Sequence, residues 1–321
     1  MTATTQFRSL TIVIPVYKNR DSLPELCRQL GTLDTGEVIV DVVFVVDGSP
    51  DDSADVLRSC AHEVGGAVVI VELSRNFGSF AAIREGLRRA TGDVVSVIAA
   101  DLQEPPDLVP RLVDALQEHN ADVAIGTRVG RADPLGTRLS SAIFWMLYRR
   151  FVQREMPSGG VDVFAVSRRA LGALLTMEER NTSLVGQLLW IGFDRVSVPY
   201  TRQPRHSGKS AWTMRKKLRY MTDSVFSFTD LPIRIMIGIG TLGAAAIAVV
   251  SLLVLLQWLL GNVEVPGYTP LMLALLFVGF VLILGLGVIG SYLWRTYENS
   301  KRRPSAVVRA VEQFGVPGQN D

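Results

Sequence analysis

The stretch DVVSVIAADLQEPP, residues 93–106, decides the fold of this chain. Its first half is an apolar run rich in β-branched residues, which is typical of a strand buried on both faces of a sheet. Pro105 and Pro106 then end strand pairing and turn the chain. Asp101 is therefore expected at the carboxyl end of a central strand, where open α/β sheets bind their ligands. Taken alone, the stretch is also compatible with a solvated loop aspartate after a core strand.

The first 130 residues alternate strand and helix patterns at the spacing of βαβ units. We expect strands over residues 10–16, 38–46, 67–73, 93–100 and 122–126, and one more near 161–166. We expect helices over residues 21–31, 80–91, 107–119 and 138–150, and another that starts in a capping box at Ser49 and Asp52. Strands joined by short crossovers predict an α/β fold with a doubly wound, mainly parallel sheet.

Polar side chains follow four of these strands, where each strand ends. The segments are Pro15–Tyr17, Asp47–Ser49, Leu73–Gly78 and Asp101–Gln103. Because the carboxyl ends of parallel strands share one edge of a sheet, the four segments outline a nucleotide pocket. Asp47 is suited to accept a hydrogen bond from a base or ribose. Asp101 and Gln103 offer the oxygen ligands that a hard cation on a diphosphate prefers.

The last third of the chain has the composition of a membrane protein. Residues 235–260 and 271–294 contain no Asp, Glu, Lys, Arg or His and are long enough for two transmembrane helices. Lys and Arg flank both segments, whereas the loop 261–270 has neither. The positive-inside rule therefore predicts a multi-pass protein of the cytoplasmic membrane with both termini in the cytoplasm. We expect no cleaved signal peptide.

A basic stretch precedes the first apolar segment. Residues 195–221 contain eight Lys and Arg and no Asp or Glu. Such a stretch either lies on anionic headgroups and binds a lipid phosphate, or serves as a plain positive-inside anchor. The part over residues 214–229 is compatible with a helix in the membrane interface.

Several functional classes have no support in the sequence. Cys27 and Cys60 are expected to be free buried thiols. His62, His119 and His206 lack the spacing of metal ligands. The net charge of +2 gives no electrostatic support for nucleic-acid binding.

Taken together, the motifs resemble family 2 glycosyltransferases, and within them the polyprenyl-phosphate glycosyltransferases, such as bactoprenol glucosyltransferases and dolichol-phosphate mannose synthases. The matching motifs are IPVYKN (14–19), VVDGSPDDS (45–53), LSRNFGS (73–79), AADLQEPPDLVP (99–110), IGTRVGR (125–131), RHSGKSAW (205–212) and GVIGSYLWRTYENSKRRP (287–304). The resemblance implies a cytoplasmic GT-A domain over residues 1–200, a basic interfacial segment over 201–234, two transmembrane helices within 235–294 and a cytoplasmic tail over 295–321.

The resemblance also assigns roles to residues of this chain. The positions that match catalytic ones are Asp101, Asp162 and Arg128. The positions that match nucleotide-binding ones are Pro15, Tyr17, Asp47, Ser49, Arg75, Asp101 and Gln103. Asp101 and Gln103 would hold Mg²⁺ or Mn²⁺. The positions that match acceptor-phosphate sites are Arg128, Arg138, Arg205 and Ser210.

Four positions depart from the family pattern. Val46 and Ala99 stand where the family usually has aspartates, Ser291 replaces a glutamate, and Ala211 replaces a lysine. Fewer carboxylates predict weaker metal binding, or a metal that relies more on donor phosphates and water. The departures also leave room for a different donor or for a degenerate enzyme.

The resulting functional hypothesis is inverting transfer of one hexose, from UDP-glucose, to undecaprenyl phosphate, giving a lipid-linked sugar for modification of cell-envelope glycans. The alternatives are a GDP-mannose-dependent transferase and a membrane-tethered pseudoenzyme that binds nucleotide without transfer. A processive polysaccharide synthase fits less well, because the segment Gln187–Trp190 lacks the arginine of the Gln-x-x-Arg-Trp motif. The expected partners are a nucleotide sugar, a polyprenyl phosphate and the membrane. Glycine-rich spans would also permit a homo-oligomer.

Overall fold

The computed structural model of the protein describes residues 7–129, 146, 148–150, 153–157, 160–179, 182–203, 214–260 and 268–315. The chain divides into two compact units. The first, here called the sheet unit, comprises Met1–Lys217 together with Pro304–Asp321, and the second, the helical unit, comprises Leu218–Arg303. The chain thus leaves the sheet unit once and returns to it.

The sheet unit is built on one eight-stranded sheet with the order β7-β5-β6-β4-β1-β2-β3-β8. The strands are β1 (Ser9–Val16), β2 (Ile39–Val46), β3 (Val68–Leu73), β4 (Val94–Val97), β5 (Val123–Arg128), β6 (Phe164–Ser167), β7 (Arg195–Tyr200) and β8 (Val308–Phe314). Within this sheet β6 and β8 run antiparallel to their neighbours, and the other pairs are parallel. The predicted α/β fold with a mainly parallel sheet is confirmed.

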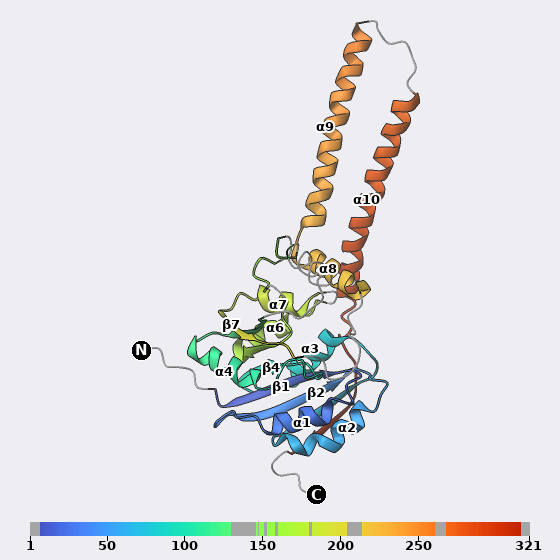
Figure 1. The fold of residues 1–321 in the computed structure, drawn as a ribbon. Helices are drawn as coiled ribbons and strands as arrows, with labels where there is room; N and C mark the ends of the chain where they lie inside the picture. The colour runs from blue at the N-terminus through green and yellow to red at the C-terminus, as the bar shows by residue number, and fades with distance from the viewer. Residues whose placement is uncertain are drawn as a thin grey trace. The chain divides into compact units, whose positions relative to one another are not determined.

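Helices cover both faces of the sheet. They are α1 (Leu23–Gly31), α2 (Ser53–Cys60), α3 (Ser79–Arg89), α4 (Leu108–Glu118), α6 (Arg168–Thr176) and α7 (Leu184–Trp190), with a short 3₁₀ turn at Ala61–Val64. Ile12 and Phe44 pack with residues of α1, α2 and α4 in one core. On the opposite face α3 lies so close that a Cβ on Gly86 would be 2.3 Å from Val13. Figure 1 shows α1 and α2 on one side of the strands and α3 on the other.

Two local predictions were wrong at helix and strand ends. The capping box at Ser49 and Asp52 does not form, because α2 begins only at Ser53. Asp51 instead accepts hydrogen bonds from the Ser49 and Ser53 hydroxyls at 2.6 Å each, which fixes a turn before the helix. Strand β4 ends at Val97, earlier than the predicted residue 100, although the Ile98 amide still donates to Val13 O at 3.2 Å. The helix predicted over 138–150 lies largely outside the described residues.

Residues 308–314, which lie in the segment predicted only as a cytoplasmic tail, form the edge strand β8 of the sheet. β8 pairs antiparallel with β3, and Val68 lies opposite Phe314. Arg58 of α2 joins the two strands, because its Nη2 lies 2.7 Å from Glu312 and also pairs with Glu72. The returning chain is therefore held by a full strand ladder and by an ion-pair cluster.

The helical unit contains α8 (Met214–Phe228, its first residues belonging to the sheet unit), α9 (Leu231–Leu259) and α10 (Tyr268–Ser300). Within α10, Phe277–Ser300 is long and apolar enough to cross a membrane, with a mean hydropathy of 2.1. A second candidate is the helix pair Met221–Phe228 and Leu231–Gly243, which is bent by 77°. Among the described residues there are thus one or two candidate spans. The helix predicted over 214–229 is present as α8, and its location in the membrane interface stays a prediction.

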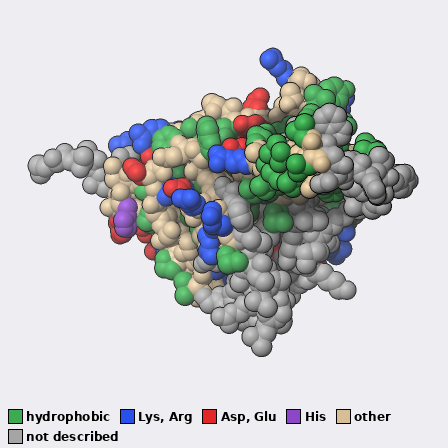
Figure 2. Space-filling view, turned by 90° about the horizontal axis from the view of Figure 1, so that it is seen from above, with side chains coloured by type: hydrophobic (Ala, Val, Ile, Leu, Met, Phe, Trp, Pro, Cys, Tyr) green, Lys and Arg blue, Asp and Glu red, His purple; other side chains and the backbone are tan. Residues whose placement is uncertain are grey.

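The surface of α9 and α10 is apolar. Leu242, Ile283 and Leu286 are exposed by 74%, 73% and 68%, which in water would be unfavourable. Figure 2 shows a group of hydrophobic side chains in one region of the surface, and charged and polar side chains over other described parts. Inside the unit the two helices meet closely at Gly243, where an added Cβ would lie 2.9 Å from the Phe277 ring. These features suit helices that are surrounded by lipid.

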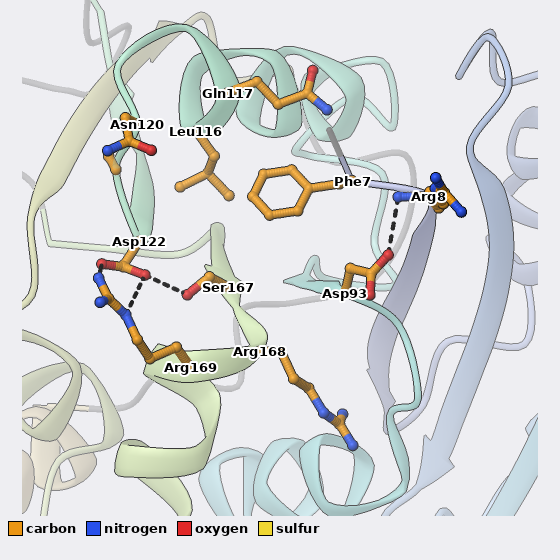
Figure 3. A pocket seen from close by; sticks show the side chains of 11 residues that line it. Phe7, Arg8, Asp93, Leu116, Gln117, Asn120, Asp122, Ser167, Arg168 and Arg169 are labelled. Atoms are coloured by element: carbon orange, nitrogen blue, oxygen red, sulfur yellow. Dashed lines mark hydrogen bonds and ion pairs between the residues drawn. The ribbon is translucent and has the colours of Figure 1, made fainter. Parts of the chain in front are cut away.

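An open cavity of about 550 Å³ lies at the amino ends of β1, β4 and β5, the edge of the sheet opposite to Asp101. Figure 3 shows Asp122 between Ser167 and Arg169 in its wall. Asp122 is buried and accepts a hydrogen bond from Ser167 Oγ at 2.7 Å and an ion pair from Arg169. Burial acts to raise the pKa of Asp122, but the contacts with Arg169 and Ser167 outweigh it and hold the pKa below its usual value.

This buried carboxylate should contribute stability that depends on pH. Because its pKa is lowered by folding, the contribution is complete above the unfolded pKa of about 3.9 and is lost as the pH falls through the lower folded value. We expect Asp122→Asn to reduce the free energy of unfolding by about 1–3 kcal/mol at pH 7, because it breaks the ion pair between this buried carboxylate and the largely exposed Arg169. The variant should also lose less stability than the wild type below about pH 4.

Thermal unfolding of the full-length protein in detergent, followed by circular dichroism from pH 7 to pH 3, measures both effects. Glu25→Gln is the control, because Glu25 pairs with Arg28 at 2.5 Å on an exposed surface. It should change the free energy of unfolding by less than about 0.5 kcal/mol. Equal pH profiles for wild type and Asp122→Asn would contradict the assignment.

Candidate active site

The carboxyl ends of the parallel strands place the predicted site residues at one edge of the sheet. Val16 at the end of β1 is opposite Val46 at the end of β2, and Val46 is opposite Glu72 of β3. The loops that leave these strands carry Tyr17, Asp47 and Arg75, as predicted. The loop after β4 carries Asp101 and Gln103, and β5 ends at Arg128. The structure therefore groups these positions by topology, while their roles in binding stay predictions.

The loops after β1 and β2 support each other through backbone contacts. Lys18 adopts a left-handed conformation with φ 58°, and its amide donates to Ser49 Oγ at 2.8 Å. The Ser49 hydroxyl in turn donates to Asp51 at 2.6 Å. Burial acts to raise the pKa of Asp51, but the donations from Ser49 and Ser53 lower it. Ser49, predicted to bind nucleotide, thus also fixes the segment that bears Tyr17, a residue that is 36% exposed.

Asp47 holds the loop after β3. It is buried, and its two carboxylate oxygens accept hydrogen bonds from the amides of Phe77 and Gly78 at 2.7 and 2.8 Å. Burial raises the pKa of Asp47, and the two amide donors oppose that shift only in part. The guanidinium of Arg75 lies 4.0 Å from the centre of the Phe77 ring. Asp47 thus fixes Phe77, and the Phe77 ring in turn contacts Arg75. The sequence predicts Asp47 as a nucleotide ligand but does not reveal this structural role.

Asp101 and Gln103 lie on a tight turn after β4. Leu102 between them has φ 58°, and the Gln103 amide donates to Asp101 Oδ1 at 3.3 Å. The Gln103 side-chain oxygen accepts a hydrogen bond from Arg202 Nη2 at 2.7 Å. Within the described residues no group of three or more His, Cys, Asp or Glu could hold a metal. A hard cation fits this turn only if phosphate oxygens and water supply most of its ligands, as the alanine at position 99 predicts.

Arg128 and Asp162 form an ion pair in the site. Their side chains are exposed by 18% and 34%, so the pair is only partly accessible to solvent. Arg128 Nε also lies 3.4 Å from the hydroxyl of Tyr200 at the end of β7. The sequence places Arg128 and Asp162 in one site, but nothing in it indicates that they pair. The pair leaves Arg128 oriented by Asp162 and Tyr200.

Glu104 and Arg202 are site residues that the sequence analysis missed. Glu104 is 1% exposed, and its Oε1 lies 3.2 Å from Arg202 Nε. Burial raises the pKa of Glu104, the negative charge of Asp101 adds to the shift, and Arg202 opposes it. In the sequence Glu104 precedes two prolines and resembles a solvated turn residue. The burial of Glu104 could not be predicted locally, because it depends on strand β7, which brings the distant Arg202 to this turn.

Three predicted acceptor-phosphate residues cannot be placed. Arg138, Arg205 and Ser210 lie outside the described residues. Arg128, the fourth predicted acceptor-phosphate residue, lies in the described part of the chain.

A family model described as glycosyl transferase family 2 matches residues 11–173, about half of the chain. The chain belongs to glycosyl transferase family 2. The matched residues run from β1 to α6 and include the turn with Asp101 and Gln103. The predicted resemblance to this family is confirmed, and the protein is a glycosyltransferase with a mainly parallel α/β sheet.

Relatives of this glycosyltransferase match over nearly their full length. An uncharacterised glycosyltransferase of Synechocystis sp. is 35% identical, over 93% of this chain and 94% of that protein. An undecaprenyl-phosphate 4-deoxy-4-formamido-L-arabinose transferase of Sodalis glossinidius is 32% identical, over 97% and 96%. A prophage bactoprenol glucosyl transferase homologue of Escherichia coli K12 is 29% identical, over 95% and 99%.

The solved structures that match this chain are more distant in sequence. The crystal structure of glucosyl-3-phosphoglycerate synthase from Mycobacterium tuberculosis with Mn²⁺, UDP and glucosyl-3-phosphoglycerate is 20% identical, with a TM-score of 0.48. The match covers 68% of this chain and 77% of that one.

Proposed function

We propose that this glycosyltransferase moves one hexose from a nucleotide sugar to a polyprenyl phosphate. The observation that carries the polyprenyl-phosphate acceptor is the similarity to the undecaprenyl-phosphate 4-deoxy-4-formamido-L-arabinose transferase of Sodalis glossinidius, which covers 97% of this chain and so includes its apolar helices. The hexose rests on the similarity to the bactoprenol glucosyl transferase homologue of Escherichia coli K12. A polyprenyl acceptor requires an enzyme that works at a membrane, and α10 supplies a candidate span. UDP-glucose is the donor we propose, with GDP-mannose as the alternative.

The chemistry suits a site with few carboxylates. The second pKa of a phosphate monoester is near 6, so a lipid phosphate is mostly dianionic at pH 7 and needs no general base. The enzyme must instead reduce the repulsion between two anionic reactants and stabilise the departing nucleoside diphosphate. Attack in line on the anomeric carbon inverts its configuration, and an α-linked donor gives a β-linked lipid phosphate.

Residues of this chain fit those tasks. Arg128, oriented by Asp162 and Tyr200, would bind a phosphate of the acceptor through charge-assisted hydrogen bonds. Tyr17 and Arg75 would bind the nucleoside and its phosphates at the ends of β1 and β3. Asp101 and Gln103 would hold Mg²⁺ or Mn²⁺, which when bound supplies positive charge to the leaving diphosphate.

We further propose two membrane crossings, by α9 and α10. Strand β8 follows the helical unit in sequence yet belongs to the same sheet as β1 to β7. Both flanks of the helical unit must therefore lie on one side of a membrane, which requires an even number of crossings. Helix α9 has 29 residues and is about 43 Å long, and α10 has 33 residues and is about 50 Å long. Both lengths exceed the thickness of a bilayer core, which is about 30 Å. By the positive-inside rule, we propose that the sheet unit lies in the cytoplasm.

The test is a donor panel with the full-length protein in detergent micelles. Undecaprenyl phosphate and Mg²⁺ or Mn²⁺ are incubated with UDP-glucose, UDP-galactose, GDP-mannose and UDP-amino sugars, and the lipid extract is analysed by mass spectrometry. We expect one hexosyl lipid phosphate, its absence without acceptor, and its loss when EDTA removes the metal. Nucleotide binding without product from any donor would contradict transfer and support the pseudoenzyme.

A further inference from the structure

The buried carboxylate of Glu104 has no role in the mechanism above. It is 1% exposed, and neither of its oxygens has a hydrogen-bond partner. Burying a carboxylate costs several kcal/mol unless a cation compensates it, and a well-packed apolar residue would avoid that cost. The cation in contact is Arg202, whose Nε lies 3.2 Å from Glu104 Oε1. Glu104 therefore serves to hold Arg202, and the question is what Arg202 holds.

Arg202 connects the buried carboxylate to Gln103. Its Nη2 donates to the Gln103 side-chain oxygen at 2.7 Å, while its Nε faces Glu104. The contact at Nε is an ion pair without a hydrogen bond. Because the guanidinium is planar and presents its donors in a fixed fork, this pairing still restricts where Nη2 can lie. The adjacent backbone adds a second tie, because the Gln203 amide donates to Gln103 O at 2.9 Å. Gln103 is thus fixed at both its side chain and its main chain.

Arg202 also connects the turn that bears Asp101 and Gln103 to the end of β7, which contacts Arg128. Arg202 follows Tyr200, the end of β7, and Tyr200 accepts a hydrogen bond from Arg128. The turn with Asp101 and Gln103 is therefore tied to the strand end that also orients Arg128. The charged groups that face Glu104 come from three elements: Asp101 from its own turn, Arg128 from β5 and Arg202 from the segment after β7.

We propose that Glu104 is a positioning residue that, through Arg202, fixes the Gln103 oxygen for the metal and the donor diphosphate. This inference rests on the proposed function of the Asp101 turn. With Asp101 as the one carboxylate of AADLQ (residues 99–103), correct placement of the neutral amide oxygen becomes more important, because a single ion–dipole contact is lost with a small displacement. Outer residues that orient metal ligands typically contribute 10- to 100-fold in metal affinity or activity.

The experiment compares wild type, Glu104→Gln, Arg202→Met and the double variant as full-length proteins in detergent. We expect each single variant to raise the Mn²⁺ concentration for half-maximal activity and the donor KM by about 10-fold, with a smaller effect on the acceptor KM. The double variant should be no worse than the poorer single one, since both break the same connection. Glu104→Asp and Arg202→Lys test the geometry without removing a charge, and Arg202→Lys should resemble Arg202→Met because the ammonium lacks the fork.

Calorimetric binding of UDP with and without Mn²⁺ provides a readout that does not need turnover. The gain in UDP affinity that Mn²⁺ gives should shrink by about 10-fold in Glu104→Gln, and UDP binding without metal should not change. Glu85→Gln is the matched control, because Glu85 is also buried and pairs with Arg89 at 3.1 Å on α3. It should alter thermal stability but not the metal dependence.

Two results would overturn the proposal. One is an unchanged Mn²⁺ dependence of UDP binding in folded Glu104→Gln. The other is a double variant whose losses add, which would mean that Glu104 and Arg202 act separately. A wild-type protein that makes no lipid-linked sugar would instead refute the proposed function, and the calorimetric comparison would still decide the role of Glu104.

Discussion

Asp101→Ala should reduce formation of the lipid-linked sugar by at least about 100-fold, the usual effect of losing one electrostatic stabiliser of the transition state. Asp101 lies on the turn that follows the central strand β4, at the ligand-binding edge of the sheet. Alanine already occupies position 99, so the substitution removes the carboxylate that remains in the AADLQ motif. Initial rates measured by mass spectrometry with saturating donor and acceptor give the effect.

Asp101→Asn separates charge from shape in this experiment. It keeps the size and one oxygen of the side chain, so a comparable loss of rate would assign the effect to the negative charge. Both variants should unfold within a few degrees of the wild type, since Asp101 is not part of the buried core. A rate within about threefold of wild type in Asp101→Ala, with the protein folded, would remove Asp101 from the site.

Gly48→Ala should both destabilise the sheet unit and abolish donor binding. Gly48 has φ 55°, and an added Cβ would lie 2.2 Å from the carbonyl carbon of Arg75 and 2.4 Å from the Asn76 amide nitrogen. These are backbone atoms, so the loop after β3 must move. The movement would break the bonds from Phe77 and Gly78 to Asp47. We expect a loss of about 2–4 kcal/mol in the free energy of unfolding, as for other clashes at strained positions.

Gly36→Ala is the control for backbone strain without a clash. Gly36 has φ 59°, nearly the same as Gly48, but nothing lies within 4 Å of its added Cβ. It should cost about 1–2 kcal/mol for the left-handed conformation and leave donor binding intact. Thermal unfolding and calorimetry with UDP distinguish the two variants. Equal effects of the two substitutions would contradict the close packing of Gly48 on the loop after β3.

Much of the sheet could be predicted because its central strands are continuous apolar runs. β1, β2 and β3 lie within one residue of the predicted ranges, since strands buried on both faces leave a clear pattern in the sequence. The edge that carries Tyr17, Asp47 and Asp101 followed from the parallel topology alone. Helix and strand ends were less predictable, because local side-chain bonds such as Ser49 to Asp51 decide them.

The parts that escaped prediction depend on contacts between distant residues. Arg58 and Glu312 are 254 residues apart, and Arg202 and Gln103 are 99 apart. The alternating exposure of β8 is too short a signal to distinguish an edge strand from a polar tail. The residues next to Glu104 in the sequence do not predict its burial, because the contact that compensates its charge comes from Arg202 after β7.

Because the chain returns to the sheet as β8, the sheet cannot be completed until the end of this segment has been synthesised. During synthesis β3 has an open outer edge until residues 308–314 leave the ribosome, after both apolar helices have been made. Unpaired strand edges promote aggregation, and domains normally fold as the chain emerges. In this protein the apolar helices are available for the membrane before the sheet is complete. If α9 and α10 cross the membrane as proposed, the nascent glycosyltransferase would reach the bilayer before β8 completes its sheet.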